Sequence, residues 1–229
     1  PGEIYGLIGP DGAGKSSLMK AIAGVLAYEG GAVQVFGQDI DSEAAAERVK
    51  VRLGFMPQGL GLNLYPELSV EENVNFFAEL RDVGPELLAQ RKQKLLAMTR
   101  LDKFRARPMK QLSGGMKQKL GLVCTLIHEP ELIILDEPTT GVDPVSRRDF
   151  WLILTQLLRE RGVTALVSTA YLDEAARFHH LSLMLAGKVL AQGAPEAILG
   201  QVPGALLELR AEPQVEALNR LLAEFPQTE

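Results

Sequence analysis

The segment from Gly9 to Ser16 constrains the fold more than any other part of this 229-residue chain, because it reads GPDGAGKS and fits the pattern G-x-x-x-x-G-K-[ST]. It follows a short apolar run, Ile4 to Ile8, and precedes apolar residues at helical spacing from Ser16 to Leu26. In this order of strand, loop and helix, glycines let successive backbone N–H groups surround phosphate oxygens at the positive end of a helix dipole. The alternative is an ordinary glycine turn that opens a helix, and the flanking strand and helix favour the phosphate loop over it.

The side chains of this loop predict a site for a nucleoside triphosphate. Lys15 is expected to reach the β- and γ-phosphates, and the Ser16 hydroxyl is expected to ligate Mg²⁺. The predicted nucleotide-binding residues are Gly9, Pro10, Asp11, Gly12, Ala13, Gly14, Lys15, Ser16 and Ser17.

Two carboxylates, Asp136 and Glu137, come directly after the apolar run Leu132 to Leu135. Ligands of parallel α/β sheets bind at the carboxyl ends of the strands, which is where this pair would lie. We expect Asp136 to hold Mg²⁺ through water, and Glu137 to accept a proton from the water that attacks the γ-phosphate. An acidic pair after a strand is by itself more often the start of a solvated loop, and only the presence of Lys15 reverses that preference.

The remaining periodicity predicts an α/β protein with a mainly parallel sheet and a helical insertion. Continuous apolar runs are typical of parallel strands buried on both faces, and alternation with helices indicates a doubly covered sheet. Ser69, with Glu72 three residues on, forms a capping-box pattern at the start of a helix. The predicted strands are Ile4–Ile8, Ala32–Phe36, Leu53–Met56, Leu132–Leu135 and Thr164–Ser168, with a hairpin of Leu183–Ala186 and Val189–Ala191; the predicted helices include Ser69–Leu80 and Pro85–Thr99.

The composition limits the classes of partner that are expected to bind this chain. A net charge of −5 repels a polyphosphate backbone, so direct contact with nucleic acid is not expected. The lone cysteine, Cys124, cannot form an internal disulfide, which fits a reducing compartment. No uncharged apolar stretch approaches the roughly 18 residues that span a bilayer, so no transmembrane segment is predicted in this chain.

A second glycine turn, Leu112-Ser113-Gly114-Gly115-Met116-Lys117-Gln118, opens another predicted helix. Its physics is again anion binding at a helix N-terminus, although one nucleotide rarely needs two γ-phosphate cradles in one chain. We therefore expect this turn to close over a nucleotide held by another copy or another domain, so that ATP is sandwiched between two domains. The residues assigned to this role are Ser113, Gly114, Gly115 and Gln118.

These strings, in this order, resemble the motifs of ABC-type ATPases over about residues 1 to 200. The resemblance places Lys15 in the Walker A loop, Gln58 in the Q-loop, Ser113 in the signature, Asp136 and Glu137 in Walker B, and Asp143 in the D-loop. It implies that Gln58 contacts Mg²⁺ and the attacking water, that Asp143 lines a homo- or heterodimer interface between two cassettes, and that the cofactors are ATP and Mg²⁺. Glu137, Gln58 and Lys15 would then be the catalytic residues.

The same resemblance implies a P-loop, RecA-like nucleotide-binding core over residues 1–64 and 115–200 and an ABC-type helical signature subdomain over residues 65–114. Residues 201–229 are expected to be a truncated C-terminal extension, with a strand at Ala205–Ala211 and a helix at Val215–Glu224.

Within that family, Leu68–Asn73 and Tyr171–Ala175 look like drug-exporter ATP-binding subunits. More narrowly, Pro10–Gly12, Met56–Gly61 and Ser168–Tyr171 resemble the first cassette of ribosome-associated, multi-domain ABC ATPases. The implied function is ATP-driven export with a transmembrane permease, as a peripheral protein on the cytoplasmic side of the inner or plasma membrane. A soluble ABC ATPase that acts on ribosomes in translation stays the alternative.

Two positions depart from the family pattern. Ala170 stands where most members have a histidine that bonds the γ-phosphate, and a methyl group cannot make that contact. Asp11 stands where the family usually has asparagine. The first departure leads to the hypothesis that this site hydrolyses ATP slowly.

Overall fold

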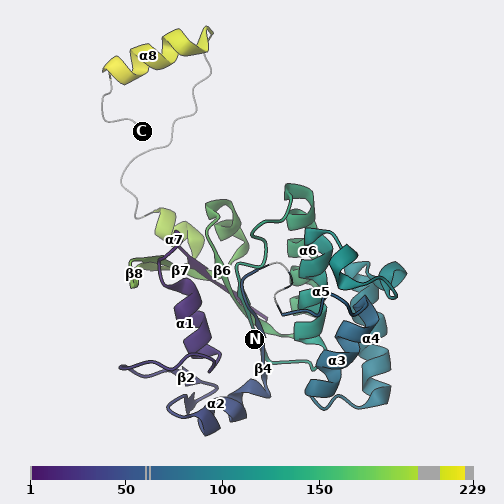
Figure 1. The fold of residues 1–229 in the computed structure, drawn as a ribbon. Helices are drawn as coiled ribbons and strands as arrows, with labels where there is room; N and C mark the ends of the chain where they lie inside the picture. The colour runs from purple at the N-terminus through teal and green to yellow at the C-terminus, as the bar shows by residue number, and fades with distance from the viewer. Residues whose placement is uncertain (1, 60, 62, 201–211, 225–229) are drawn as a thin grey trace. The chain divides into compact units, whose positions relative to one another are not determined.

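The structure is a computed structural model that describes residues 2–59, 61, 63–200 and 212–224. The chain divides into two compact units, Pro1–Ile198 and Leu199–Glu229. The first unit holds a six-stranded sheet in the order β4-β5-β6-β1-β7-β8 (Figure 1). Strands β4 to β7 in this order are parallel, and β8 pairs antiparallel to β7. The strands are β1 (Ile4–Ile8), β4 (Leu53–Met56), β5 (Leu132–Asp136), β6 (Thr164–Thr169), β7 (His180–Leu185) and β8 (Lys188–Gly193).

Helices cover both faces of this sheet (Figure 1). Strand β5 shows the reason, because Ile133 and Leu135 belong to one hydrophobic cluster and Ile134 belongs to the other. The prediction of an α/β protein with a mainly parallel sheet is thus confirmed. The helices are α1 (Lys15–Ile22), α2 (Glu43–Lys50), α3 (Val70–Leu80), α4 (Pro85–Thr99), α5 (Gly114–Leu126), α6 (Pro144–Arg161) and α7 (Pro195–Leu199), with short 3₁₀ turns at Asp102–Phe104, Met109–Gln111 and Leu172–Arg177.

The helical insertion packs into the core of the same unit. Val74 of α3 and Leu95 of α4 share a hydrophobic cluster with Leu120 of α5 and Ile133 of β5. Helix α3 begins after Ser69 with the full capping box to Glu72, as predicted. The subdomain boundaries at residues 65 and 114 stay a prediction.

Some elements differ from the sequence prediction. Helix α1 ends at Ile22 rather than Leu26, because Gly24 takes a left-handed φ of 66° and the Val25 N–H bonds back to the Lys20 carbonyl. The strand predicted at Ala32–Phe36 shortens to β2 (Gln34–Val35), paired with β3 (Gln38–Asp39). Helix α2, an alanine-rich segment that Ser42 caps, was not predicted.

The second unit contains α8 (Gln214–Glu224), which agrees with the predicted helix to within one residue at its start. The strand predicted at Ala205–Ala211 lies outside the described residues. In the described part of the chain, no helix is long and apolar enough to cross a membrane.

Candidate nucleotide-binding site

The predicted phosphate loop lines a hollow of about 250 Å³ at the carboxyl ends of the parallel strands. Gln58 follows β4 and Glu137 follows β5, so the parallel sheet brings both to the loop that follows β1. The lining residues are Asp11, Gly12, Ala13, Gly14, Lys15, Ser16, Ser17, Gln58 and Glu137.

The start of α1 leaves backbone donors available to a ligand. Gly14 precedes the helix with φ 98°, a backbone conformation that residues other than glycine rarely adopt. No side chain caps this end of the helix, and its first turn holds no acidic residue. Its first N–H groups and the positive end of the helix dipole therefore suit a phosphate.

Lys15 is buried, with 4% of its surface exposed, and its ammonium group is fully partnered. Its Nζ donates to the carbonyl oxygens of Gly9 at 2.8 Å and Pro10 at 3.1 Å. The same nitrogen lies 3.1 Å from Oε1 of Glu137. A buried lysine retains its charge only with such partners, and this ion pair holds it beside the loop.

Glu137 is 5% exposed and adopts a left-handed backbone with φ 46°. Strain of this kind persists only where surrounding contacts over-determine it. Oε2 of Glu137 accepts from Gln58 Nε2 at 2.8 Å and from Thr140 Oγ1 at 3.1 Å. Its backbone N–H donates to Ser168 Oγ at 2.8 Å, so both ends of the residue are held.

Asp136 has one carboxylate oxygen available to a cation beside the loop. Its Oδ1 accepts from Ser16 Oγ at 3.0 Å and from Ser168 Oγ at 2.6 Å. Its Oδ2 is buried and has no hydrogen-bond partner among the described residues. An unpartnered buried carboxylate oxygen is unfavourable by itself, whereas a carboxylate and a hydroxyl oxygen form a donor set of the kind that Mg²⁺ takes. The residues present therefore fit this ion.

The second glycine turn does not reach the hollow. Ser113 is exposed and caps α5 by accepting from the Met116 N–H at 3.3 Å, and Asp143 caps α6 by accepting from the Ser146 N–H at 2.9 Å. That hydrogen bond from Ser146 lowers the pKa of the Asp143 carboxyl group. Gln118 of α5 is 1% exposed in this chain, and its role toward a partner's nucleotide stays a prediction.

Ser168, for which the sequence predicts no role, lies at the centre of the site. Strand pairing sets Ser168 opposite Asp136, and its hydroxyl bonds both Asp136 and the Glu137 backbone. The only sequence signal was a hydroxyl residue at the end of a strand predicted to be buried. Ala170 lies just beyond it and is exposed.

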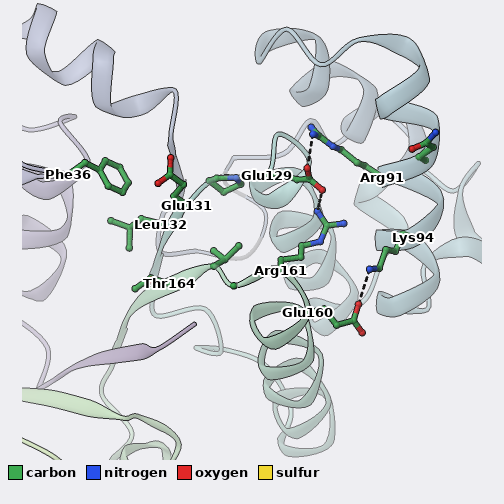
Figure 2. A pocket seen from close by; sticks show the side chains of 13 residues that line it. Phe36, Arg91, Lys94, Glu129, Glu131, Leu132, Glu160, Arg161 and Thr164 are labelled. Carbon is green, nitrogen blue, oxygen red and sulfur yellow. Dashed lines mark hydrogen bonds and ion pairs between the residues drawn. The ribbon is translucent and has the colours of Figure 1, made fainter. Parts of the chain in front are cut away.

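A larger hollow of about 850 Å³ lies at the opposite end of β5 and β6, where Leu132 and Thr164 begin these strands (Figure 2). Most of its charges pair with one another, and Glu131 pairs with Arg52 outside the lining. Glu129 accepts from Arg91 at 2.6 Å and from Arg161 at 2.5 Å, and Lys94 lies 2.9 Å from Glu160. None of the predicted site residues lines this hollow.

A phosphate loop between strand and helix, with a lysine and two carboxylates at the carboxyl ends of parallel strands, defines a P-loop nucleotide-binding domain. The family model described as "ABC transporter" matches residues 1–140. The chain belongs to this family.

Individual relatives agree with the assignment. A probable multidrug ABC transporter ATP-binding protein, YbhF of Escherichia coli, is 47% identical over 204 residues, which are 89% of this chain and 34% of that protein. The daunorubicin resistance ATP-binding protein DrrA3 of Streptomyces coeruleorubidus is 34% identical over 96% of this chain and 69% of its own length. The chain thus spans about a third of the YbhF protein.

Solved structures share the fold. The ATP-binding cassette MJ0796, in a dimeric post-hydrolysis state bound to ADP and Pi, matches with a TM-score of 0.75 and 25% identity over 85% of this chain and 86% of that one. The prediction of an ABC-type α/β P-loop fold is thereby confirmed.

Proposed function

We propose that this chain is an ATP-binding and ATP-hydrolysing cassette that energises export across a membrane. The observation that carries the proposal is the buried group of Lys15, Glu137 and Asp136 beside the phosphate loop, with one carboxylate oxygen open to a cation. The relatives named for multidrug transport and daunorubicin resistance support export, and they favour it over action on ribosomes.

Binding of ATP requires Lys15 to exchange partners. The phosphates would take the N–H groups of the loop from Gly9 to Ser17 and draw Lys15 Nζ away from Glu137 and from the two carbonyl oxygens. Ser16 and Asp136 would hold Mg²⁺, with Gln58 beside them, and the ion would neutralise charge on the phosphate oxygens. Without ATP, Lys15 is thus paired with Glu137 and with two carbonyl oxygens, and ATP would replace these partners with its phosphates.

The exchange of partners by Lys15 would free one carboxylate oxygen of Glu137 for hydrolysis. Once Lys15 withdraws, Oε1 of Glu137 is free to accept a proton from water, while Gln58 and Thr140 keep Oε2 in place. Ala170 supplies no hydrogen bond to the γ-phosphate, so we propose that turnover is slow.

The sandwich part of the proposal concerns the turn at the start of α5, where Ser113 is exposed. Ser113, Gly114, Gly115 and Gln118 would close over the nucleotide of a second cassette, and Asp143 would lie at the same interface, in a homo- or heterodimer. The dimeric state of MJ0796 supports this arrangement. A transmembrane permease is the proposed second partner, which would place the chain peripherally on the cytoplasmic side of the inner or plasma membrane. Direct contact with nucleic acid is not part of the proposal.

The proposed function divides the chain into three parts. Residues 1–64 and 115–200 would form the RecA-like core, residues 65–114 the signature subdomain, and residues 201–229 an extension.

The test is whether the Glu137→Gln variant associates when nucleotide is added, as measured by light scattering. Loss of the general base should let ATP and Mg²⁺ hold a closed dimer that the wild type releases after turnover. Glu131→Gln is the matched control, because Glu131 is an exposed glutamate that pairs with Arg52 at the other end of β5. A Glu137→Gln variant that binds ATP and stays monomeric would contradict the sandwich.

A further inference from the structure

Glu174 is a buried carboxylate that the proposed chemistry does not use. It lies in the 3₁₀ turn Leu172–Arg177 and is 1% exposed. A carboxylate in this position must have its lone pairs satisfied inside the protein, because water does not reach it.

Three hydrogen bonds satisfy Glu174, each from a different segment. Trp151 Nε1 of α6 donates to Oε1 at 2.7 Å, and Thr139 Oγ1 donates to the same oxygen at 2.9 Å. Thr169 Oγ1 at the end of β6 donates to Oε2 at 2.7 Å. All three donors are neutral and buried, so hydrogen bonding satisfies both carboxyl oxygens, and each donor would lose its partner without Glu174.

The positions of the two threonines connect this network to the site. Thr139 is two residues beyond Glu137 and four before Asp143, in the loop between β5 and α6. Thr169 directly follows Ser168, which holds Asp136 and the Glu137 backbone. Successive residues of a strand point to opposite faces, so the end of β6 holds the Asp136–Glu137 segment with one hydroxyl and Glu174 with the next.

We propose that Glu174 is a positioning residue for ATP hydrolysis, which couples the loop after Glu137 to the end of β6 and to Trp151. The strained backbone of Glu137 stays in place because both sides of its segment are fixed, through Ser168 before it and through Thr139 and Glu174 after it. Movement of this loop when nucleotide binds changes the hydrogen bond at Trp151, although Trp151 does not line the nucleotide hollow. This inference rests on the proposed function.

Thr139→Val tests it in the full-length protein, because the change removes one hydroxyl and keeps the shape of the side chain. We expect kcat for phosphate release to fall about tenfold, as the loss of one hydrogen bond that holds the Glu137 segment predicts, with KM for ATP within twofold. The rate is taken as the part of phosphate release that Glu137→Gln abolishes. Thr99→Val is the matched control: Thr99 is also fully buried and donates only within α4, so its loss should leave kcat unchanged.

Tryptophan emission supplies a second readout. Addition of ATP and Mg²⁺ should change the part of the emission that Trp151→Phe removes, and Thr139→Val should abolish this change while ATP still binds. Glu174→Gln should keep more activity than Glu174→Ala, because a carboxamide oxygen can still accept from Trp151 and Thr139 while its nitrogen donates to Thr169.

The outcomes separate the two proposals. If Thr139→Val lowers the unfolding free energy as Thr99→Val does but leaves kcat and the emission change intact, Glu174 has only a structural role and the inference is wrong. If the wild type binds no ATP at the site of Lys15, the proposed function fails, and this inference falls with it.

Discussion

The two ends of the central sheet both collect charged side chains, but they satisfy them differently. At the carboxyl end, Lys15 and Glu137 are almost completely buried, and Asp136 beside them keeps an oxygen with no partner among the described residues. At the amino end, Glu129 is 44% exposed and pairs with two arginines, and Lys94 is 51% exposed beside Glu160.

The comparison indicates which charged groups are available to bind a ligand. Buried charges are stable only with complete partners, so an incomplete set indicates that something outside the chain completes it. Exposed pairs contribute little because water screens them. Arg161 Nε is buried without an acceptor in the described part of the chain, yet its Nη1 is paired with Glu129, so its charge is balanced. The larger hollow, whose charges are paired within the chain, therefore offers a ligand less than the smaller one does.

The largest expected effect is at the carboxyl end. Glu137→Gln should lower the rate of ATP hydrolysis by about 10² to 10⁴, because the carboxamide cannot accept the proton of the attacking water. Phosphate release at saturating ATP measures it. Wild-type rates in the variant would remove Glu137 from the mechanism.

Ser168→Ala should weaken Mg²⁺-dependent nucleotide binding by about 10-fold to 100-fold, as expected when a group that orients a metal ligand is lost. The alanine leaves Asp136 Oδ1 with Ser16 as its remaining donor. Calorimetric titration of the nucleotide over a series of Mg²⁺ concentrations gives the shift. An unchanged Mg²⁺ requirement would show that Asp136 needs no such support.

Ala170→His should raise turnover about tenfold, because an imidazole beyond β6 supplies the γ-phosphate contact that a methyl group lacks. Steady-state hydrolysis at saturating ATP compares the two proteins. A rate that stays equal or falls would reject the explanation of slow turnover.

His128, near the amino end of the sheet, should make stability depend on pH. Burial, with nearby Arg81, lowers the pKa of its imidazole to about 4, and the unfolded chain protonates it near 6.5. The unfolded state then binds more protons as the pH falls, so the unfolding free energy should decrease between pH 6.5 and about 4. The loss should be on the order of 2 kcal/mol, because His128 is only partly buried and water screens part of the cost of its charged form.

Urea denaturation at pH 7 and pH 5 checks this expectation against His128→Gln, which stays neutral and should lose less stability over the same interval. Parallel pH profiles for the two proteins would exclude a role for His128.

The smallest effect is expected for Lys94→Ala, which removes an exposed ion pair at the amino end. The unfolding free energy should change by less than about 1 kcal/mol, and hydrolysis should not change. A large effect on either would mean that the two ends of the sheet are coupled.

The sequence predicted those parts of the site that follow from local pattern and strand order. Lys15, Asp136 and Glu137 lie together because each follows or ends a parallel strand, and that rule needs no coordinates. Ser168 and Glu174 were not recognised, because their contacts depend on the register of β5 against β6 and on how a 3₁₀ turn packs.

Errors in the predicted elements have similar causes. The end of α1 depended on the backbone angle of Gly24, and the strand expected at Ala32–Phe36 shortened to Gln34–Val35. Neither boundary was fixed by the hydrophobic period, which gives the existence of an element better than its ends.

Binding of ATP with Mg²⁺ to the wild type, Lys15→Ala and Lys94→Ala tests the comparison of the two ends most directly. We expect saturable binding in the wild type and in Lys94→Ala, and its loss in Lys15→Ala. Binding that survives Lys15→Ala but is lost in Lys94→Ala would place the nucleotide at the amino end of the sheet and contradict the account.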